Sequence, residues 1–345
     1  MFVRVLILFF FISCSADKYN WFNGTLDDAL SSIDSNSEKL ILLDFYADGW
    51  GGCVRLDAET LSDPRVIEFS NSNFISLKLK PWENDRHSEL LEQYRGQAIP
   101  LLIFLNNKGE EVDRILGFHE ADEYLSMITD IYNGIDTYLY LKLQYQSGQK
   151  TSSILSKLSA KCKLNPDPNF CEDIYKDIIT IRDGFDNQIL FDADFFFAGK
   201  KLEEDNPNLM LQLIKNHEGA KYTADAYFSM INYYKIKDDI KSESDIFRKF
   251  SDIFNDDPST LNRYAWRMTE LGMNLDDALN KSNRAIELSF DNPSLQTYII
   301  DTKAEILWML GRIDEAIITI DLAIDINPND EYLIEQRAKF LNSKK

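Results

Sequence analysis

Cysteine and histidine are scarce in this chain of 345 residues, which contains four cysteines and three histidines. His87, His119 and His217 are well separated, and none has a partner at the spacing of a metal-binding motif. A phosphate-binding loop of the form GxxxxGK[ST] is also missing from the sequence. The sequence therefore predicts neither a bound metal nor a cofactor.

Positive charge is also in short supply, because 37 lysines and arginines stand against 57 aspartates and glutamates. The formal net charge of −20 repels phosphate backbones, so nucleic acid is not an expected partner. Apolar residues make up 44% of the chain, which is enough for a packed core. At about 150 residues per domain, the length suits two domains.

A long apolar run occurs only near the N-terminus. Arg4 followed by the apolar residues 5–12 predicts an export signal over residues 1–16, since a membrane span needs about 20 apolar residues. Residues 11–14 resemble a bacterial lipobox with Cys14 as a lipidated residue, and the alternative is ordinary cleavage near Ala16. Either way we expect the periplasm or cell envelope, where disulfides persist, with membrane contact only through a lipid anchor.

Two of the cysteines, Cys162 and Cys171, flank the turn-rich segment KLNPDPNF between two helical patterns. The short loop between them makes ring closure geometrically possible. We therefore predict a structural disulfide between them, which leaves Cys53 without a cysteine partner.

Residues 19–133 alternate between helix and strand signals. The continuous apolar run LILLDFYA, residues 40–47, is typical of a buried strand. Further strands are expected at residues 74–79, 100–106 and 112–118, and helices at 26–33, 63–69, 87–94 and 120–132. This order predicts an α/β sandwich with strands of mixed direction.

The pieces LLDFYAD, GGCVRLD, SDPRVIEF, the AIP before LLIFL, and NKGEEVDRILGF resemble the bacterial thioredoxin-like family in order and spacing. The resemblance implies a thioredoxin fold over this third of the chain. The family loop reads WCxxC, and its first cysteine is activated at a helix N-terminus. Here Gly49 stands at the tryptophan position, Trp50 at the attacking cysteine and Cys53 at the resolving cysteine. The motif Trp50-Gly51-Gly52-Cys53 is therefore degenerate.

Dithiol exchange requires two sulfurs, so this domain is not expected to complete the family's reaction alone. Cys53 is interpreted either as a small buried apolar residue or as the thiol of a single-cysteine exchange. Asp44 matches the family's buried acid, and its candidate catalytic role is proton transfer to Cys53; simple inheritance of a polar residue is the alternative.

Ile99-Pro100 matches the position of the family's cis-proline, where the preceding backbone pairs with an extended substrate. The resemblance implies a peptide-binding groove that needs no sulfur. A proline that only shapes the turn is the alternative.

Strand signals stop after residue 133. Residues 304–330 resemble a tetratricopeptide repeat, with Ala304, Gly311, Ala316, Ala323 and Pro328 at its characteristic positions. A second copy spans residues 264–288, and a degenerate third copy spans 226–254, with Ser244 and Ser251 in place of alanines. We expect a helical linker or decayed repeats over 134–223 and an all-α repeat domain over 224–345. Such stacks usually bind a protein or peptide on a concave surface, and the alternative is that they only dock onto the first domain.

The sequence thus predicts a non-catalytic binding or scaffold protein of the cell envelope, acting through its repeats and the proline groove. The alternative is a thiol-dependent redox protein that uses Cys53. A minor alternative is export in a eukaryote, since Asn23-Gly24-Thr25 is a glycosylation acceptor.

Overall fold

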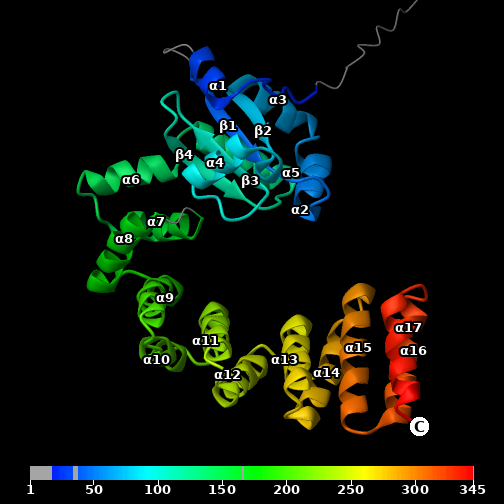
Figure 1. The fold of residues 1–345 in the computed structure, drawn as a ribbon. Coiled ribbons are helices and arrows are strands. Elements are labelled where there is room, and N and C mark those ends of the chain that lie inside the picture. Colours follow the sequence, from blue (N-terminus) through cyan, green and yellow to red (C-terminus); the bar gives the residue numbers. More distant parts are fainter. Residues whose placement is uncertain (1–17, 34–37, 165–166, 345) are drawn as a thin grey trace, which may run out of the picture. The chain divides into compact units, whose positions relative to one another are not determined.

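The computed structural model describes residues 18–33, 38–164 and 167–344. The chain divides into two compact units, one up to residue 193 and one from residue 194 on, and each is described by itself (Figure 1). The expected export signal and Cys14 lie outside the described residues. The domain limits expected at residues 133 and 223 remain predictions.

A four-stranded sheet forms the centre of the first unit. Its strands are β1 (Leu40–Phe45), β2 (Phe74–Leu79), β3 (Leu101–Leu105) and β4 (Glu111–Leu116), in the order β2-β1-β3-β4. β1 and β2 run parallel with Asp44 opposite Lys78, whereas β3 is antiparallel to both of its neighbours. The predicted sandwich with strands of mixed direction is therefore confirmed.

Helices cover both faces of this sheet. They are α1 (Leu26–Ser32), α2 (Gly51–Arg55), α3 (Pro64–Asn73), α4 (Asp85–Gln93) and α5 (Ala121–Tyr132). Side chains alternate along β1, so Ile41 and Leu43 pack with α1 and α4, whereas Leu42 packs with α3 and α5. The same alternation directs Asp44 to the face of Leu42, beneath α2.

Three further helices follow in this unit. They are α6 (Tyr138–Gln146), α7 (Ser152–Leu164) and α8 (Pro168–Ile181) (Figure 1). Of these, α6 and α7 lie beside the edge strand β4, and α8 packs against α7. Lys161 of α7 forms an ion pair with Asp113 of β4, and Arg114 Nη1 donates to the Leu164 carbonyl at 3.3 Å. These contacts cover an edge that would otherwise expose unpaired backbone groups. α9 (Asn187–Glu203) follows and crosses the division between the units.

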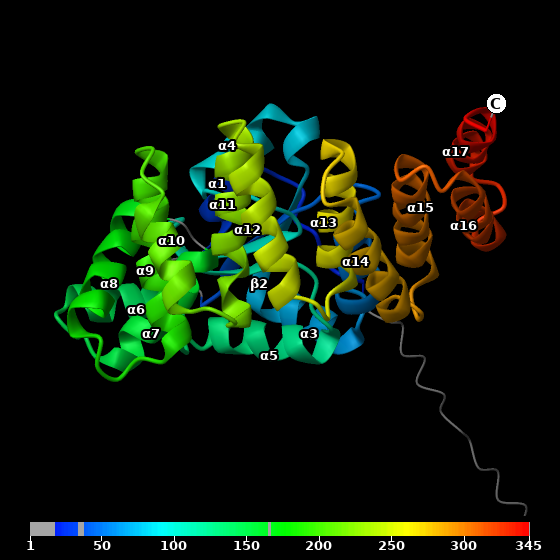
Figure 2. The ribbon, with the colours of Figure 1, turned by 90° about the horizontal axis from the view of Figure 1, so that it is seen from below.

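The second unit consists of stacked antiparallel helices (Figure 2). They are α10 (Asn208–Asn216), α11 (Ala224–Ile236), α12 (Ile240–Ile253), α13 (Pro258–Leu271), α14 (Leu275–Leu288), α15 (Pro293–Met309), α16 (Ile313–Ile326) and α17 (Glu331–Asn342). The pairs α11–α12, α13–α14 and α15–α16 coincide with the three repeats identified in the sequence, so the helical-repeat fold is confirmed.

Small residues let the paired helices approach each other closely. Ala285 and Ala323 are completely buried, and Ser251 takes the same place in the degenerate repeat. Gly272 and Gly311 end the first helix of their pairs with φ values of +63° and +73°, a region that favours glycine.

Candidate functional site

The site is built on the loop that leads from β1 into α2. Gly49 has a φ of +71° and turns the chain, and Trp50 then caps α2 without a side-chain capping bond. The Trp50 side chain is 58% exposed. The position that the thioredoxin resemblance assigns to the attacking cysteine is therefore occupied by an accessible indole ring, which supplies no nucleophile.

Cys53 lies one turn further into α2 and is a free cysteine with 3% exposure. Burial raises the pKa of its thiol, and the nearby charges of Asp44 and Asp57 raise it further. A backbone hydrogen bond at Ala47 and the charge of Lys78 act in the opposite direction without reversing the shift. The thiol is therefore protonated at neutral pH and is a poor nucleophile.

Asp44 lies on β1 and is only 1% exposed. Neither of its carboxylate oxygens has a hydrogen-bond partner among the residues that the structure describes. Burial raises its pKa to about 7, with Lys78 opposing and Asp57 adding to the rise. Lys78 Nζ itself contacts the two Asp57 oxygens at 2.5 and 2.6 Å. The lysine is thus paired with Asp57, and the pKa of about 7 means that Asp44 gains or loses its proton near neutral pH.

Pro100 directly precedes β3, and its peptide bond with Ile99 is cis. A Cβ placed on Gly52 would lie 3.1 Å from Pro100 Cδ, so the loop and the proline are in close contact. Pro100 accepts a hydrogen bond from Gly117 N–H at 2.8 Å. Within the described part of the chain, Ile99 makes no backbone hydrogen bond. Its N–H and C=O are therefore available beside the loop.

A second exposed tryptophan lies near this loop. Lys80, which directly follows β2, contacts Asp48 of the loop at 2.5 Å and Glu83 at 3.2 Å. Trp82, between Lys80 and Glu83, is 69% exposed. Because β1 and β2 are parallel, both segments emerge at the same edge of the sheet. Trp50 and Trp82 thus present aromatic surface at one end of the domain.

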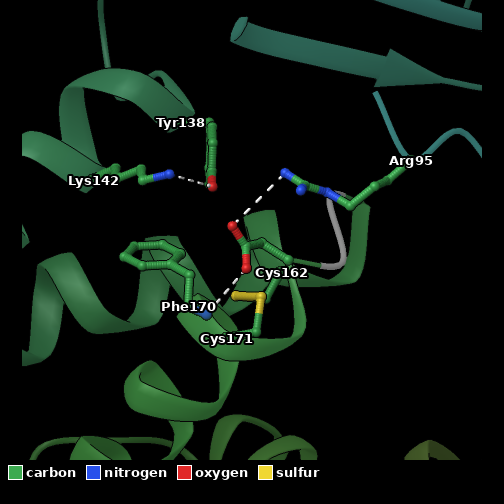
Figure 3. The surroundings of a disulfide bond; sticks show 7 residues. Arg95, Tyr138, Lys142, Cys162, Phe170 and Cys171 are labelled. Atoms are coloured by element: carbon green, nitrogen blue, oxygen red, sulfur yellow. Dashed lines mark hydrogen bonds and ion pairs between the residues drawn. A yellow bond between two sulfur atoms is a disulfide. The ribbon is translucent and has the colours of Figure 1, made fainter. Parts of the chain in front are cut away.

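Cys162 and Cys171 are joined by a disulfide that connects α7 to α8 (Figure 3). Phe170, beside the disulfide, packs edge-on against Tyr138, with ring centroids 6.0 Å apart. The Asp167 side chain accepts from Phe170 N–H and lies 3.7 Å from Arg95. This arrangement holds the start of α8 near Arg95 and Tyr138 and is separate from Cys53.

The structure therefore brings together Trp50, Gly52, Cys53, Asp44 and Pro100, and it places the disulfide elsewhere. Sequence reasoning missed the Lys78–Asp57 pair, although the alternation of β2 could have placed Lys78 beside Asp44. In the described residues, no group of three acidic, histidine or cysteine side chains is arranged to hold a metal. Over the same ranges, no helix has the length and apolarity of a membrane span.

Residues 26–132 match the model of a thioredoxin-like domain. Over 100 residues the chain is 31% identical to "Thioredoxin-1" of Drosophila yakuba, which covers 29% of this chain and 84% of that protein. It is 23% identical over 141 residues to "Thiol:disulfide interchange protein DsbD" of Photorhabdus laumondii, covering 35% of this chain and 24% of that protein. The matched segment thus spans no more than about a quarter of the length of these DsbD relatives.

Two solved structures have similar features. A chain titled "DsbH Oxidoreductase" matches with a TM-score of 0.31 and 17% identity, covering 38% of this chain and 95% of that one. Yeast Tom70 matches with a TM-score of 0.29 and 15% identity, covering 65% of this chain and 57% of that one.

Proposed function

The chain belongs to the thioredoxin-like family through residues 26–132, and from this premise we propose that it is an exported binding or scaffold protein that has lost dithiol chemistry. The observation that carries the proposal is the pair of positions 50 and 53. Trp50 occupies the site of the attacking sulfur, and Cys53 is buried with a raised pKa. Two sulfurs are needed to form and release a mixed disulfide, and the domain lacks the attacking one at position 50.

Peptide binding by the first domain is supported by features that need no sulfur. The free N–H and C=O of Ile99 can pair with an extended chain by strand addition. Trp50 and Trp82 offer exposed aromatic surface for the side chains of that peptide. The proposed ligand is therefore an extended, partly apolar segment of a protein.

The helical repeats provide a second proposed binding surface. A pocket of about 640 Å³ opens between α11 and α13, with Phe228, Arg263 and Trp266 among its lining residues. Arg263 lies over the Phe228 ring at 5.0 Å from its centroid, and Trp266 is 39% exposed. Mixed aromatic and charged surfaces of this kind are common in protein interfaces.

Export is supported by the pattern of residues 1–16 and by the disulfide, which persists in oxidising compartments. The proposed location is the periplasm or cell envelope. Lipidation of Cys14 would anchor the protein to a membrane, and signal cleavage near Ala16 would release it.

A second candidate function is disulfide exchange by Cys53 alone. It is favoured by Asp44, whose pKa of about 7 suits a proton acceptor beneath the thiol. Asp44 would take the Cys53 proton, the sulfur would attack a partner's disulfide, and the displaced thiolate would take up that proton from Asp44 and leave as a thiol. The product would be a mixed disulfide, which a further partner thiol must release.

One comparison separates the two functions. The chain from residue 18 on and its Cys53→Ser variant are assayed for reduction of oxidised glutathione, with a dithiol reductant as the electron donor, and for binding of S-alkylated insulin B chain. We expect equal background rates of reduction, and binding that is lost in Trp50→Ala and kept in Trp50→Phe. A reduction rate that depends on Cys53 would contradict the proposed scaffold function. If the peptide does not bind, the groove at Pro100 is not a binding site of the scaffold.

A further inference from the structure

A pocket of about 350 Å³ lies at the end of the helical repeats, between α15, the connection from α16 to α17, and α17. It is lined by Thr297, Tyr298, Asp301, Asn327, Asp330 and Tyr332, among others. The volume is at the small end of the range of about 300–1,000 Å³ that is typical of ligand sites. Aromatic and acidic groups dominate its polar lining.

Asp301 is the central feature of this pocket. It is 8% exposed, and its Oδ2 accepts from the Tyr332 hydroxyl at 3.3 Å. Its Oδ1 is buried and has no partner among the described residues. Burying a carboxylate without a cation is unfavourable, so folding alone does not account for an acid at this position.

The neighbouring charges leave the pocket in need of a cation. Asp330 and Glu305 add negative charge near Asp301. Lys339 is the nearby cation, but its Nζ contacts the two Glu305 oxygens at 2.6 and 2.7 Å. Lys339 is therefore paired with Glu305, and it offsets the charge on Asp301 only in part.

Two aromatic rings complete the lining. Tyr298 is 69% exposed and Tyr332 is 48% exposed, although both belong to well-packed helices. Aromatic faces attract ammonium and guanidinium groups, and a buried carboxylate strengthens that preference. Since no described group of three acidic, histidine or cysteine residues could hold a metal, an organic cation fits better than a metal ion.

The pocket between α11 and α13 shows the contrast. Its buried acid, Glu243, is 1% exposed, but Arg267 donates to both of its oxygens at 2.7 and 3.0 Å. That acid is satisfied within the chain. Among the described residues Asp301 has no such paired cation, so of these two pockets the one at α15 contains the acid whose charge is not balanced.

We propose that the pocket at Asp301 receives the lysine or arginine side chain of a protein partner. The proposal rests on the proposed binding function of the repeats and names the chemistry of one contact within it. The ammonium or guanidinium would pair with the Asp301 carboxylate and lie against Tyr298 and Tyr332. A net charge of −20 on the whole chain favours the approach of a basic segment.

Binding should depend on pH. The pKa of Asp301 is raised to about 6, chiefly by burial and also by Glu305 and Asp330, while the Tyr332 hydrogen bond and Lys339 lower it. A cation binds the ionised carboxylate, so affinity should fall as the pH drops from 7 to 5.

The test uses the chain from residue 18 on, labelled with ¹⁵N and titrated with acetyl-Gly-Lys-Gly-amide and its arginine analogue. The glutamine analogue is the neutral probe. We expect saturable shifts in the amide signals of Thr297 and Tyr332 with the two basic peptides alone. Asp301→Asn should weaken binding at least about tenfold, as loss of a charge-assisted bond does.

Asp276→Asn is the matched control, because it removes an exposed acid of α14 that does not line the pocket. It should bind as wild type does. Asp301→Asn should also unfold at the same temperature as wild type or higher, since it removes an uncompensated buried charge. Equal affinity of Asp301→Asn and wild type, or destabilisation of Asp301→Asn, would overturn the proposal. Binding of insulin B chain without any response to the basic peptides would overturn this contact and leave the proposed function standing.

Discussion

Asp44 and Lys78 lie opposite each other across the β1–β2 pair, yet the Lys78 ammonium contacts Asp57 and leaves the Asp44 carboxylate without a hydrogen bond. The acid therefore keeps its proton up to about pH 7 in the folded protein. In the unfolded chain it releases that proton near pH 4. Ionisation of Asp44 thus acts against folding.

Asp44→Asn is expected to stabilise the protein above pH 7. The folded state binds more protons than the unfolded state between about pH 4 and pH 7, so wild type loses stability as the pH rises through this range. The variant does not, and its gain should reach about 2–4 kcal/mol at pH 8 and vanish below pH 4. Urea unfolding of the first unit from pH 4 to 8 measures the difference.

Asp57→Asn serves as the control for this series. It leaves Asp44 buried but removes a negative charge that raises its pKa, so the loss of stability should end at a lower pH and be smaller than in wild type. A difference between Asp44→Asn and wild type that does not change with pH would contradict the account.

Cys53 should react slowly with iodoacetamide in the folded protein at every pH below 8.5. Its thiol is buried and its pKa is raised, so little thiolate is present at the surface. The alkylation rate is measured against pH with the Cys162–Cys171 disulfide kept oxidised, and Cys53→Ser gives the background. Rapid alkylation with a midpoint well below the value of about 8.5 for free cysteine would instead support the redox function.

Trp50→Cys should restore dithiol chemistry. The ring is exposed and makes no capping bond, so its loss costs little stability, and a sulfur there would lie at the N-terminus of α2. We expect the variant to reduce oxidised glutathione at least about tenfold faster than wild type when a dithiol reductant regenerates it. Trp50→Ser removes the same ring without adding sulfur and should stay at the wild-type rate. Equal rates for both variants would mean that the loop no longer activates a thiol.

The disulfide should stabilise the first unit by about 2–3 kcal/mol, because it closes a loop over a sequence separation of 9. The double variant Cys162→Ser/Cys171→Ser is compared with wild type by urea unfolding, with and without a reductant. Wild type and Cys53→Ser should both weaken when reduced, whereas the double variant should not respond. A reductant effect that persists in the double variant would assign the stabilisation to another group.

The fold was predictable because its signals are local. The apolar run in β1, the alternation in β2, and the glycine and alanine positions of the repeats each follow from the periodicity of one element. The placement of α6–α8 was not predictable in this way. It depends on Lys161 and Arg114, which contact partners about 50 residues away in the sequence.

The candidate site was predictable only as a set of positions. Alignment with a family motif located Trp50, Cys53 and Pro100, but it gave no information about exposure. Whether Lys78 pairs with Asp44 or with Asp57 depends on side-chain geometry, which the sequence does not reveal. Likewise, Asp301 stands out because Lys339 lies on Glu305, a relationship between two helices that no spacing in the sequence reveals.

Gly51 and Gly52 provide a matched test of the contact between the loop and Pro100. A Cβ on Gly51 meets nothing within 4 Å, so Gly51→Ala should stabilise the protein by about 0.5–1 kcal/mol through the lower entropy of the unfolded chain. A Cβ on Gly52 would lie 3.1 Å from Pro100 Cδ, so the same substitution there should lose that gain and weaken binding of the insulin B chain. Thermal unfolding and the binding assay on both variants measure these effects. If both variants gain equal stability and bind the peptide as wild type does, Pro100 can move to accommodate the added methyl group. The proline would then only shape the turn.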